Sequence, residues 1–404
     1  MYKSLQMLLL LLIIGVFFTA CGPKTTTTGE TPTEVPASQT GGGGGTGSGD
    51  TIKIGAYFSM TGDIATFGQS SVNAIRLAVD EINASGGVLE KKLDLIVEDT
   101  QSKQDGAAAA VQKLISQNNV DVILGEVASS NSLAAAPIIQ KSQIPMISPS
   151  STNPAVTQTG DYIFRVCFID PFQGYVMAKF AKEKLKLKKA ALLVDQSCDY
   201  CIGLAQYFKD TWTKEGGEIL AQEAYFQKDT DFKGQLTNIK GKNPELLFVP
   251  GYYTEVGLIA KQARQLGIKA PLLGGDGWDS PKLLEIGGKD IEGGYFSNHY
   301  SVEADTPKIK AFVGEYEKRY GEIPDSLSAL AYDSVYVMAD AYNRAGKVDK
   351  QALRDALAST KDFDGVTGRI TINQDRNADK SAVVLQIKGG KYTYVTTIEP
   401  PKAQ

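Results

Sequence analysis

The chain has 404 residues, of which 42% are hydrophobic and 22% charged, and this is enough for two globular domains that each bury a core. The formal net charge is -4 and the pI is near 5.4, so the chain has no excess of basic residues. This disfavours nucleic acid or an anionic membrane surface as its main partner, because both are bound through basic surfaces. A small neutral or zwitterionic ligand is compatible with this balance.

The chain opens with a segment that is typical of secretion. Lys3 precedes an apolar run at 7–18, and small residues then lead to Cys21 in the sequence FTACG. This pattern resembles a bacterial lipobox, which implies cleavage before Cys21 and lipid attachment to its thiol. The alternative is an uncleaved membrane anchor, for which the apolar run is short. Both interpretations predict an exported protein, and we take 1–20 as a lipoprotein signal peptide.

A low-complexity segment follows at 21–50. It is rich in threonine, proline and glycine, ends near the run Gly41–Gly45, and offers almost no apolar side chains to a core. We expect a flexible tether that lets a lipid-anchored domain stand off the membrane.

Strands and helices alternate through most of the remaining chain. The first part predicts strands at 52–58, 93–98, 120–124 and 145–147 and helices at 70–84, 105–117 and 132–141. After residue 169 the pattern restarts, with helices at 172–184, 203–215, 232–240 and 253–266 and strands at 190–194, 219–225, 246–250 and 271–274. Sustained alternation predicts the α/β class with parallel sheets, and two such runs predict two doubly wound lobes.

The last third of the chain departs from this alternation. Helices at 307–320 and 327–345 lie between short extended segments near 297–302 and 371–374, which are placed to carry the chain between the lobes. Two final strands, at 382–388 and 392–398, are separated by the turn Gly389-Gly390.

Two turns rich in hydroxyl groups follow the strands at 120–124 and 145–147. The first contains Ser129 and Ser130, and the second runs from Ser150 to Thr152. Because the carboxyl ends of parallel strands meet at one edge of a sheet, the hydroxyl groups and the amides of helix N-termini converge there and suit a carboxylate. The same side chains also fit a purely structural role as helix caps.

Three residues of the second run follow its strands in the same way. They are Tyr200, Tyr252 and Asp276, the last of them among glycines and beside Trp278. An acid with aromatic neighbours at a sheet edge suits an ammonium group. The alternative is a solvated loop acid with two ordinary surface tyrosines.

The sequence offers little to a catalytic mechanism. The only histidine is His299 in the strand-like YFSNHYSV, which disfavours a hydrolytic triad. Cys198 and Cys201 have the spacing of a redox pair without other redox features, so a structural disulfide or two free thiols are the interpretations left open. Cys167 resembles a small buried hydrophobic residue. We expect no metal and no cofactor, because a second cysteine pair, a neighbouring histidine and acidic calcium loops are lacking.

Seven segments of the folded part carry a family likeness: IGAYFSMTGDIATFG, DEINASGGV, ILGEVASSNS, PMISPSSTNP, DYCIGLA, GYYTEVG and GGDGW. Together they resemble the periplasmic binding proteins of branched-chain amino-acid ABC transporters, the leucine/isoleucine/valine-binding type, over essentially all of the chain from Ile52. The resemblance implies a type I periplasmic binding protein fold, with two lobes joined by three hinge crossovers. The first lobe would comprise 51–169 plus 299–376 and the second 170–298 plus 377–400.

The resemblance also assigns roles to individual positions. Ser129 and the turn of Ser150, Ser151 and Thr152 match positions that bind the α-carboxylate of the amino acid, Tyr200, Tyr252 and Asp276 match those around its α-ammonium, and Phe67 matches an aromatic of the side-chain pocket. Asp276 replaces the commoner glutamate, which shortens its reach by one methylene group.

The sequence therefore predicts a lipid-anchored, extracytoplasmic solute-binding protein that performs no chemistry. It would capture an amino acid, branched-chain or otherwise hydrophobic, and deliver it to the permease of an ABC transporter. A ligand-sensing protein, or a binder of amide- or urea-type solutes, shares this fold and is the alternative.

Overall fold

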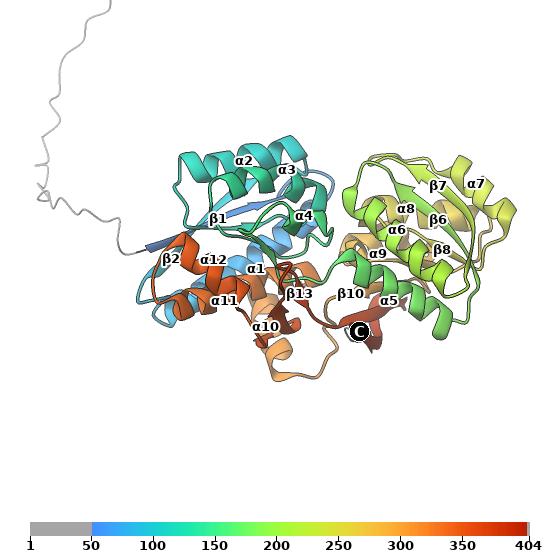
Figure 1. The fold of residues 1–404 in the computed structure, drawn as a ribbon. Coiled ribbons are helices and arrows are strands. Elements are labelled where there is room, and N and C mark those ends of the chain that lie inside the picture. The colour runs from blue at the N-terminus through green and yellow to red at the C-terminus, as the bar shows by residue number, and fades with distance from the viewer. Residues whose placement is uncertain (1–50, 402–404) are drawn as a thin grey trace, which may run out of the picture. The chain divides into compact units, whose positions relative to one another are not determined.

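The computed structural model of the chain describes residues 51–401 (Figure 1). The predicted signal peptide, the tether and Cys21 lie outside this range. Within it, none of the helices combines the length and the apolar character that crossing a bilayer requires.

The first sheet contains five parallel strands in the spatial order β2-β1-β3-β4-β5. Their bounds are β1 Thr51–Phe58, β2 Lys92–Asp99, β3 Val122–Gly125, β4 Met146–Ser148 and β5 Ile163–Arg165. Helices α1 (Ala65–Ala84), α2 (Gln104–Ser116) and α3 (Ser129–Lys141) connect the first four strands, and the single turn α4 (Ala155–Gln158) precedes β5. The chain reverses its direction across the sheet between β1 and β3, and such a switch point is where open parallel sheets bind ligands.

The second sheet contains seven strands in the order β15-β14-β10-β9-β8-β6-β7. β6 (Lys189–Asp195), β7 (Glu218–Tyr225), β8 (Leu246–Phe248), β9 (Leu272–Gly274) and β10 (Tyr295–Asn298) are parallel. The last two strands, β14 (Ala382–Lys388) and β15 (Lys391–Ile398), add to the β10 edge in antiparallel fashion. The helices of this lobe are α5 (Asp170–Glu183), α6 (Asp199–Lys214), α7 (Lys233–Lys242), α8 (Tyr253–Gln265) and α9 (Pro281–Gly287), with the short 3-10 helices η1 (Asp276–Trp278) and η2 (Gly288–Asp290).

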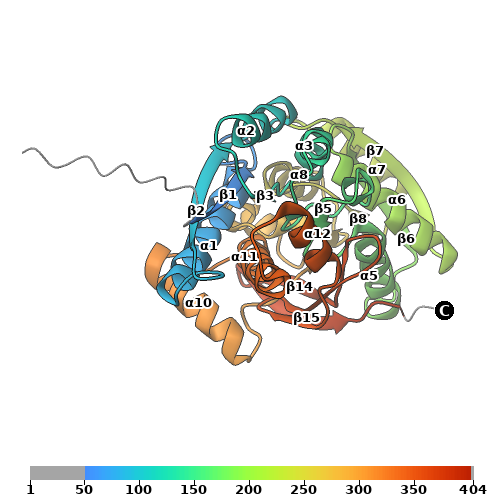
Figure 2. The same ribbon diagram turned by 60° about the vertical axis from the view of Figure 1, so that its left-hand side comes forward.

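Residues between β10 and β14 return to the first lobe. They form α10 (Pro307–Tyr320), α11 (Ser326–Ala345) and α12 (Lys350–Ala358), followed by a small antiparallel sheet of β11 (Phe363–Gly365), β12 (Gly368–Ile372) and β13 (Ala378–Asp379). Helix α11 packs against α1, as Figure 2 shows, and most of its residues are buried. The amino-terminal and carboxy-terminal parts of the chain thus share one core.

The two α/β lobes are joined by three crossovers, at 166–169, 299–306 and 380–381. The segment at 371–374, which the sequence placed near a crossover, instead overlaps β12 and pairs within the small sheet. An extended pattern does not specify the strand with which it pairs. The third crossover therefore follows β13, and the lobe boundary predicted at 376 and 377 precedes that strand.

Several helices begin earlier than the sequence predicted. Helix α1 starts at Ala65 rather than 70, α3 at Ser129 rather than 132, and α6 at Asp199 rather than 203. The first turns of α3 and α6 carry serine, aspartate, cysteine and tyrosine side chains, which do not show the apolar spacing that marks a helix. As a result, Ser129 and Tyr200 lie on helix N-terminal turns.

Candidate ligand-binding site

A cavity is lined by residues of both lobes and encloses about 290 Å³, part of it open to solvent. The first lobe contributes Phe67, Val127, Ala128, Ser129, Ser150, Thr152 and Leu327, and the second contributes Tyr200, Tyr252, Asp276 and Gly277. The structure thus brings together seven of the residues that the sequence singled out: Phe67, Ser129, Ser150, Thr152, Tyr200, Tyr252 and Asp276.

One wall of the cavity is polar and belongs to the first lobe. Ser129 is the first residue of α3, and its Oγ accepts a hydrogen bond from the amide of Asn153 at 3.2 Å. Ser150 Oγ donates to the carbonyl of Val127 at 3.3 Å. Among residues 51–401, the buried Thr152 Oγ1 finds no hydrogen-bond partner. A buried polar atom without a partner is costly, so this hydroxyl is available to a ligand.

Ser151, the remaining predicted residue of this turn, does not line the cavity. Its hydroxyl is buried and lies 2.7 Å from Ser132 Oγ, and it donates to the carbonyl of Glu126 at 2.9 Å. Ser151 therefore holds the two hydroxyl-rich turns against each other. Adjacent residues of an extended turn point to opposite sides, which places Ser150 and Thr152 on the cavity side and Ser151 behind them.

A buried acid that the sequence analysis did not single out supports the same wall. The Glu126 carboxylate accepts hydrogen bonds from the amide of Ala128 at 2.6 Å and from Thr100 Oγ1 at 3.0 Å, and burial raises its pKa. The preceding Gly125 has φ +130°, and a Cβ there would lie 2.2 Å from the carbonyl oxygen of Tyr57. Only glycine fits, so the turn after β3 depends on this residue.

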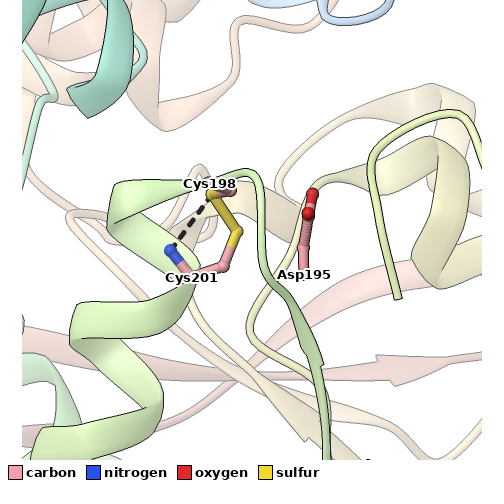
Figure 3. Close-up of side chains that lie close together, drawn as sticks. All are labelled: Asp195, Cys198 and Cys201. Atoms are coloured by element: carbon pink, nitrogen blue, oxygen red, sulfur yellow. Dashed lines mark hydrogen bonds between the residues drawn. A yellow bond between two sulfur atoms is a disulfide. The ribbon is translucent and has the colours of Figure 1, made fainter. Parts of the chain in front are cut away.

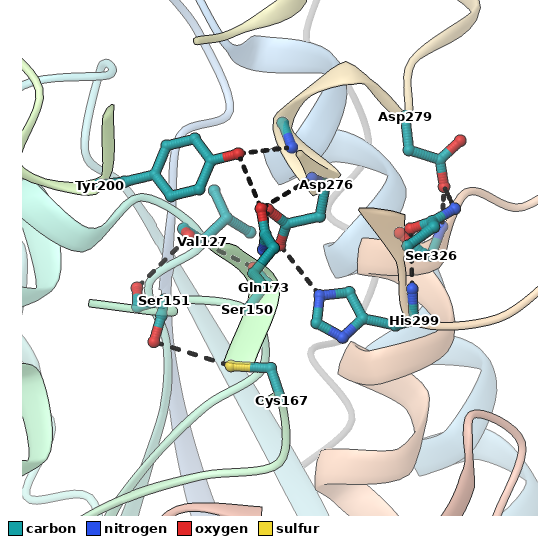
Figure 4. Close-up of polar contacts among 12 residues, drawn as sticks. Val127, Ser150, Ser151, Cys167, Gln173, Tyr200, Asp276, Asp279, His299 and Ser326 are labelled. Atoms are coloured by element: carbon teal, nitrogen blue, oxygen red, sulfur yellow. Dashed lines mark hydrogen bonds and ion pairs between the residues drawn. The ribbon is translucent and has the colours of Figure 1, made fainter. Parts of the chain in front are cut away.

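The opposite wall belongs to the second lobe and carries Asp276, which is the one acidic or basic residue among the lining residues. Asp276 begins η1 directly after β9, and its Oδ1 accepts a hydrogen bond from Gln173 Nε2 at 2.9 Å. Its Oδ2 lies 2.9 Å from Nε2 of His299 (Figure 4). Tyr200 OH accepts from the amide of Gly277 at 3.3 Å and donates to Gln173 Oε1 at 3.4 Å. The carboxylate is therefore held by two side chains, Gln173 and His299, on the edge of the cavity.

Glycine is required on both sides of Asp276, because atoms of neighbouring residues lie very close to Gly275 and Gly277. A Cβ on Gly275 would lie 1.9 Å from Gln173 Oε1 and 2.5 Å from Tyr200 OH, while one on Gly277 would lie 2.6 Å from the carbonyl oxygen of Gly251. Larger residues would push the acid and its neighbours apart. The GGDGW motif is thus explained by crowding around the carboxylate.

A third part of the lining is apolar. Phe67 packs edge-on against Tyr252, with ring centroids 6.2 Å apart, and Tyr252 stacks on Tyr200 at 5.6 Å. Val127 and Leu327 complete this surface. Apolar and aromatic side chains beside a carboxylate and several hydroxyls suit a ligand with an aliphatic part and two polar ends.

The lobes contact each other on both sides of the cavity. On one side, Ser130 Oγ accepts from the amide of Asp199 at 3.0 Å, and Asn153 Nδ2 donates to the carbonyl of Asp199 at 2.9 Å. On the other, Thr66 Oγ1 lies 3.1 Å from Ser280 Oγ. The structure therefore shows the lobes in a closed arrangement.

The cysteines lie outside the lining. Cys198 and Cys201 are joined by a disulfide at the start of α6, where Cys198 Sγ also accepts from the amide of Cys201 at 3.1 Å (Figure 3). Asp195 lies close to both sulfurs, but its Oδ1 accepts from the amide of Ser197 at 2.8 Å, and disulfide sulfurs are not thiolate ligands. Cys167 is free and buried, and burial raises the pKa of its thiol to about 12.

Sequence reasoning missed several residues of the site. Gln173 and His299 hold Asp276, and Val127, Ala128, Gly277 and Leu327 line the cavity. His299 had been considered only as a catalytic base. Gln173 lies in α5 and Leu327 in α11. No local sequence pattern relates Gln173 to the distant Asp276 or Leu327 to the cavity.

These features define a class of protein. Two α/β lobes, joined by three crossovers and closed over one small cavity, constitute a two-lobed solute-binding protein. The sequence model of the family described as "Periplasmic binding protein" matches residues 51–391, so the chain belongs to that family. Its members are binding proteins of extracytoplasmic compartments and not enzymes.

Individual relatives agree with this assignment. A Pseudomonas aeruginosa protein named as a leucine-, isoleucine-, valine-, threonine- and alanine-binding protein is 30% identical over 327 residues, which cover 80% of this chain and 86% of the relative. A crystal structure of a leucine binding protein from Thermotoga maritima is 40% identical, with a TM-score of 0.83, and covers 86% of this chain and 99% of that one. A branched-chain amino acid transporter substrate binding protein from Streptococcus pneumoniae, solved with isoleucine, is 37% identical with a TM-score of 0.82, covering 87% and 100%.

Proposed function

We propose that the protein is a lipid-anchored, extracytoplasmic binding protein that captures an α-amino acid with a branched or other hydrophobic side chain and delivers it to an ABC transporter permease. The observation that carries this proposal is the arrangement of the cavity walls. Hydroxyls on the first lobe, among them the unpartnered Thr152 Oγ1, a carboxylate on the second and an apolar surface match the three parts of such an amino acid.

In this proposal the α-carboxylate binds to Ser129, Ser150 and Thr152, near the N-terminus of α3. Hydroxyl donors and the positive end of a helix dipole both favour an anion. The α-ammonium faces Asp276 and the hydroxyls of Tyr200 and Tyr252, and the side chain lies against Phe67 and Leu327. Because the two charged groups of the ligand contact different lobes, the ligand favours the closed arrangement of the lobes.

The test is a thermal-shift screen of the mature protein against all twenty amino acids, followed by calorimetry. A ligand at 100 times its Kd stabilises the folded protein by about 2.7 kcal/mol, which gives a readily measured shift. We expect leucine, isoleucine or valine to give the largest shifts. Absence of a shift with every amino acid, or shifts with amide or urea solutes alone, would overturn the proposal.

Matched analogues separate the two charged ends. Leucinamide lacks the carboxylate and 4-methylpentanoic acid lacks the ammonium, while both keep the aliphatic chain of leucine. We expect each to bind at least about thirtyfold more weakly than leucine, because a buried charged group would lose its partner. Equal binding of 4-methylpentanoic acid and leucine would show that the ammonium is not recognised.

The anchor rests on the leader and on Cys21, which lie outside the described residues. Replacement of Cys21 by serine should abolish lipid labelling and release the protein from the membrane fraction. Retention of the label by Cys21→Ser would overturn this part of the proposal without affecting the ligand.

A further inference from the structure

The acid of the cavity is in contact with the only histidine of the sequence. His299 follows β10 on the second crossover, its side chain is fully buried, and its Nε2 lies 2.9 Å from Asp276 Oδ2. The other oxygen of Asp276 accepts from Gln173 Nε2 at 2.9 Å. A carboxylate oxygen can accept two hydrogen bonds, and each oxygen of Asp276 accepts one from these side chains, so one site remains on each for a ligand.

The contacts of His299 indicate which protonation state the site uses. Nδ1 is buried and has no hydrogen-bond partner in the part of the chain that the structure describes, while Nε2 faces a carboxylate. A neutral imidazole with its proton on Nε2 donates to Asp276 and leaves Nδ1 as an unprotonated nitrogen. Burial lowers the pKa of His299, and the neighbouring Asp276 opposes this effect, which agrees with a neutral ring in the closed protein.

The ring is held by the hinge. Phe168, on the first crossover, stacks on the imidazole with ring centroids 3.8 Å apart and an interplanar angle of 22°. Lys380, on the third crossover, is buried and acts on His299 as a nearby positive charge. His299 of the second crossover thus contacts Phe168 of the first crossover and Asp276 of the second lobe.

We infer that His299 is a positioning residue for ligand binding, which fixes the Asp276 carboxylate by donating a hydrogen bond to it from the hinge. The inference rests on the proposed function, because it requires a ligand whose cationic group binds to Asp276. Neutral His299 leaves the full negative charge of the acid to the ligand, whereas imidazolium would place a second cation beside the same oxygens.

Ligand binding and protonation of His299 are therefore antagonistic. The titratable groups that act on the ring are Asp276 of η1, which contacts it, and Lys380 of the third crossover. Helix α5 contributes the neutral Gln173, which contacts Asp276, and the buried Asp170, whose pKa is raised by burial and by the charge of Asp276. By linkage, a cationic ligand on Asp276 lowers the pKa of His299, and affinity falls as the pH falls through the pKa of the unliganded protein. The limiting slope is about tenfold in Kd per pH unit, for one proton released.

The experiment compares two variants of similar size by calorimetry with leucine at pH 5.5 and 7.5. His299→Gln keeps an N–H donor that does not titrate, and His299→Leu removes the donor. We expect His299→Leu to bind about ten- to a hundredfold more weakly at pH 7.5 and His299→Gln to bind within about fivefold of wild type. The affinity of His299→Gln should also change less between the two pH values than that of the wild type. Wild-type affinity in His299→Leu, equal weakening in both variants, or an unchanged pH profile in His299→Gln would each overturn the inference.

A measurement on the wild type needs no substitution. Because the chain has one histidine, nitrogen NMR of protein purified without a histidine tag reports its tautomer and pKa without ambiguity. We expect the Nε2–H tautomer and a lower pKa with saturating leucine than without it. A protonated Nδ1, or the same pKa in both states, contradicts the inference. If leucine does not bind to the wild type, the proposed function fails, while the tautomer of the free protein still tests the contact with Asp276.

Discussion

Asp279 of the second lobe accepts a hydrogen bond from the backbone amide of Ser326, the first residue of α11 in the first lobe, at 2.7 Å. The same oxygen, Oδ2, accepts from Asn298 Nδ2 at 2.9 Å, and all three residues are buried. The first amides of a helix have no partner within it and favour a negative charge. Since the next residue, Leu327, lines the cavity, this contact connects closure of the lobes with the shape of the site.

We expect Asp279→Ala to weaken binding of leucine by about ten- to a hundredfold, because a hydrogen bond to a charged group contributes about 1.5 to 3 kcal/mol. The amide of Ser326 would be buried without its partner only when the lobes close. Small-angle scattering at equal saturation should then show a larger radius of gyration than for the wild type. Asp305→Ala is the control, because the side chain of Asp305 is 87% exposed. Unchanged affinity and radius would contradict the role given to Asp279.

A second acid near this contact makes stability depend on pH. Burial and the charge of Asp279 raise the pKa of Asp325 from 3.8 to about 7. Between about pH 4 and 7 the folded chain therefore binds this proton more tightly than the unfolded chain. The contribution to the free energy of unfolding decreases as pH rises through this window, by at most about 1.4 kcal/mol per pH unit, and is constant on either side.

Asp325→Asn isolates this contribution. Asparagine keeps an oxygen for the amide of Ser328, which donates to Asp325 at 2.7 Å, but it does not titrate. Urea unfolding at pH 4.5, 6 and 7.5 should show that the variant gains stability relative to the wild type as pH rises. Parallel pH profiles of the two proteins would refute the assignment.

The counter-ion role of Asp276 predicts a large effect from a small change. Loss of one partner of a desolvated charge pair costs about 2 to 5 kcal/mol, so Asp276→Asn should weaken leucine binding roughly thirtyfold to several thousandfold. Calorimetry measures the affinity, and circular dichroism should show an intact fold. The same substitution at Asp364, whose side chain is 84% exposed beside Lys308, should leave affinity unchanged. Binding by Asp276→Asn within about threefold of wild type would show that the acid does not face the ammonium.

Two glycines allow a matched test of crowding at the site. In Gly275→Ala the new methyl group overlaps Gln173 and Tyr200, so we expect weaker leucine binding together with a lower midpoint of thermal unfolding. Gly234 lies in α7, and a Cβ there would meet nothing within 4 Å. Gly234→Ala should therefore stabilise the fold by about 0.5 to 1 kcal/mol with unchanged affinity. Equal behaviour of the two variants in calorimetry and thermal unfolding would argue against crowding around Asp276.

The disulfide predicts a specific pattern of alkylation. In denatured, unreduced protein, peptide mapping should find Cys167 labelled and Cys198 and Cys201 unlabelled, and reduction should expose all three. In the folded protein Cys167 should react slowly, because its thiol is buried and its pKa is raised to about 12. Labelling of Cys198 and Cys201 without reduction would show that the two thiols are free in the air-oxidised protein.

The parallel α/β class followed from the sequence because strands and helices alternate with clear periodicity, and the comparisons confirm the two-lobed fold. Element starts were less accurate where a first turn carries polar side chains, as in α3 and α6. The helix α12 was not predicted, although one face of it buries Leu353, Ala356 and Leu357. Its nine residues are short for a periodic pattern to be distinguished from a loop.

The sequence could predict that residues directly after the strands belong to the site, because the carboxyl ends of parallel strands meet at one edge of a sheet. The direction in which each side chain of a turn points could not be predicted. We therefore expected Ser151 in the site, although its hydroxyl faces Ser132 and Glu126. The residues that support Asp276 lie 103 positions earlier and 23 positions later in the chain. Such contacts depend on how the three crossovers bring distant segments together, and the local sequence does not specify this arrangement.

The order in which strands enter the second sheet has a consequence for how the chain folds. β10 gains its outer neighbour, β14, only after more than eighty residues have returned to complete the first lobe. Neither lobe is therefore a continuous piece of chain, and each must close long loops before its sheet or helix layer is complete. Contacts so distant in sequence slow folding. A newly exported chain thus remains without its final edge strands until its last residues have emerged.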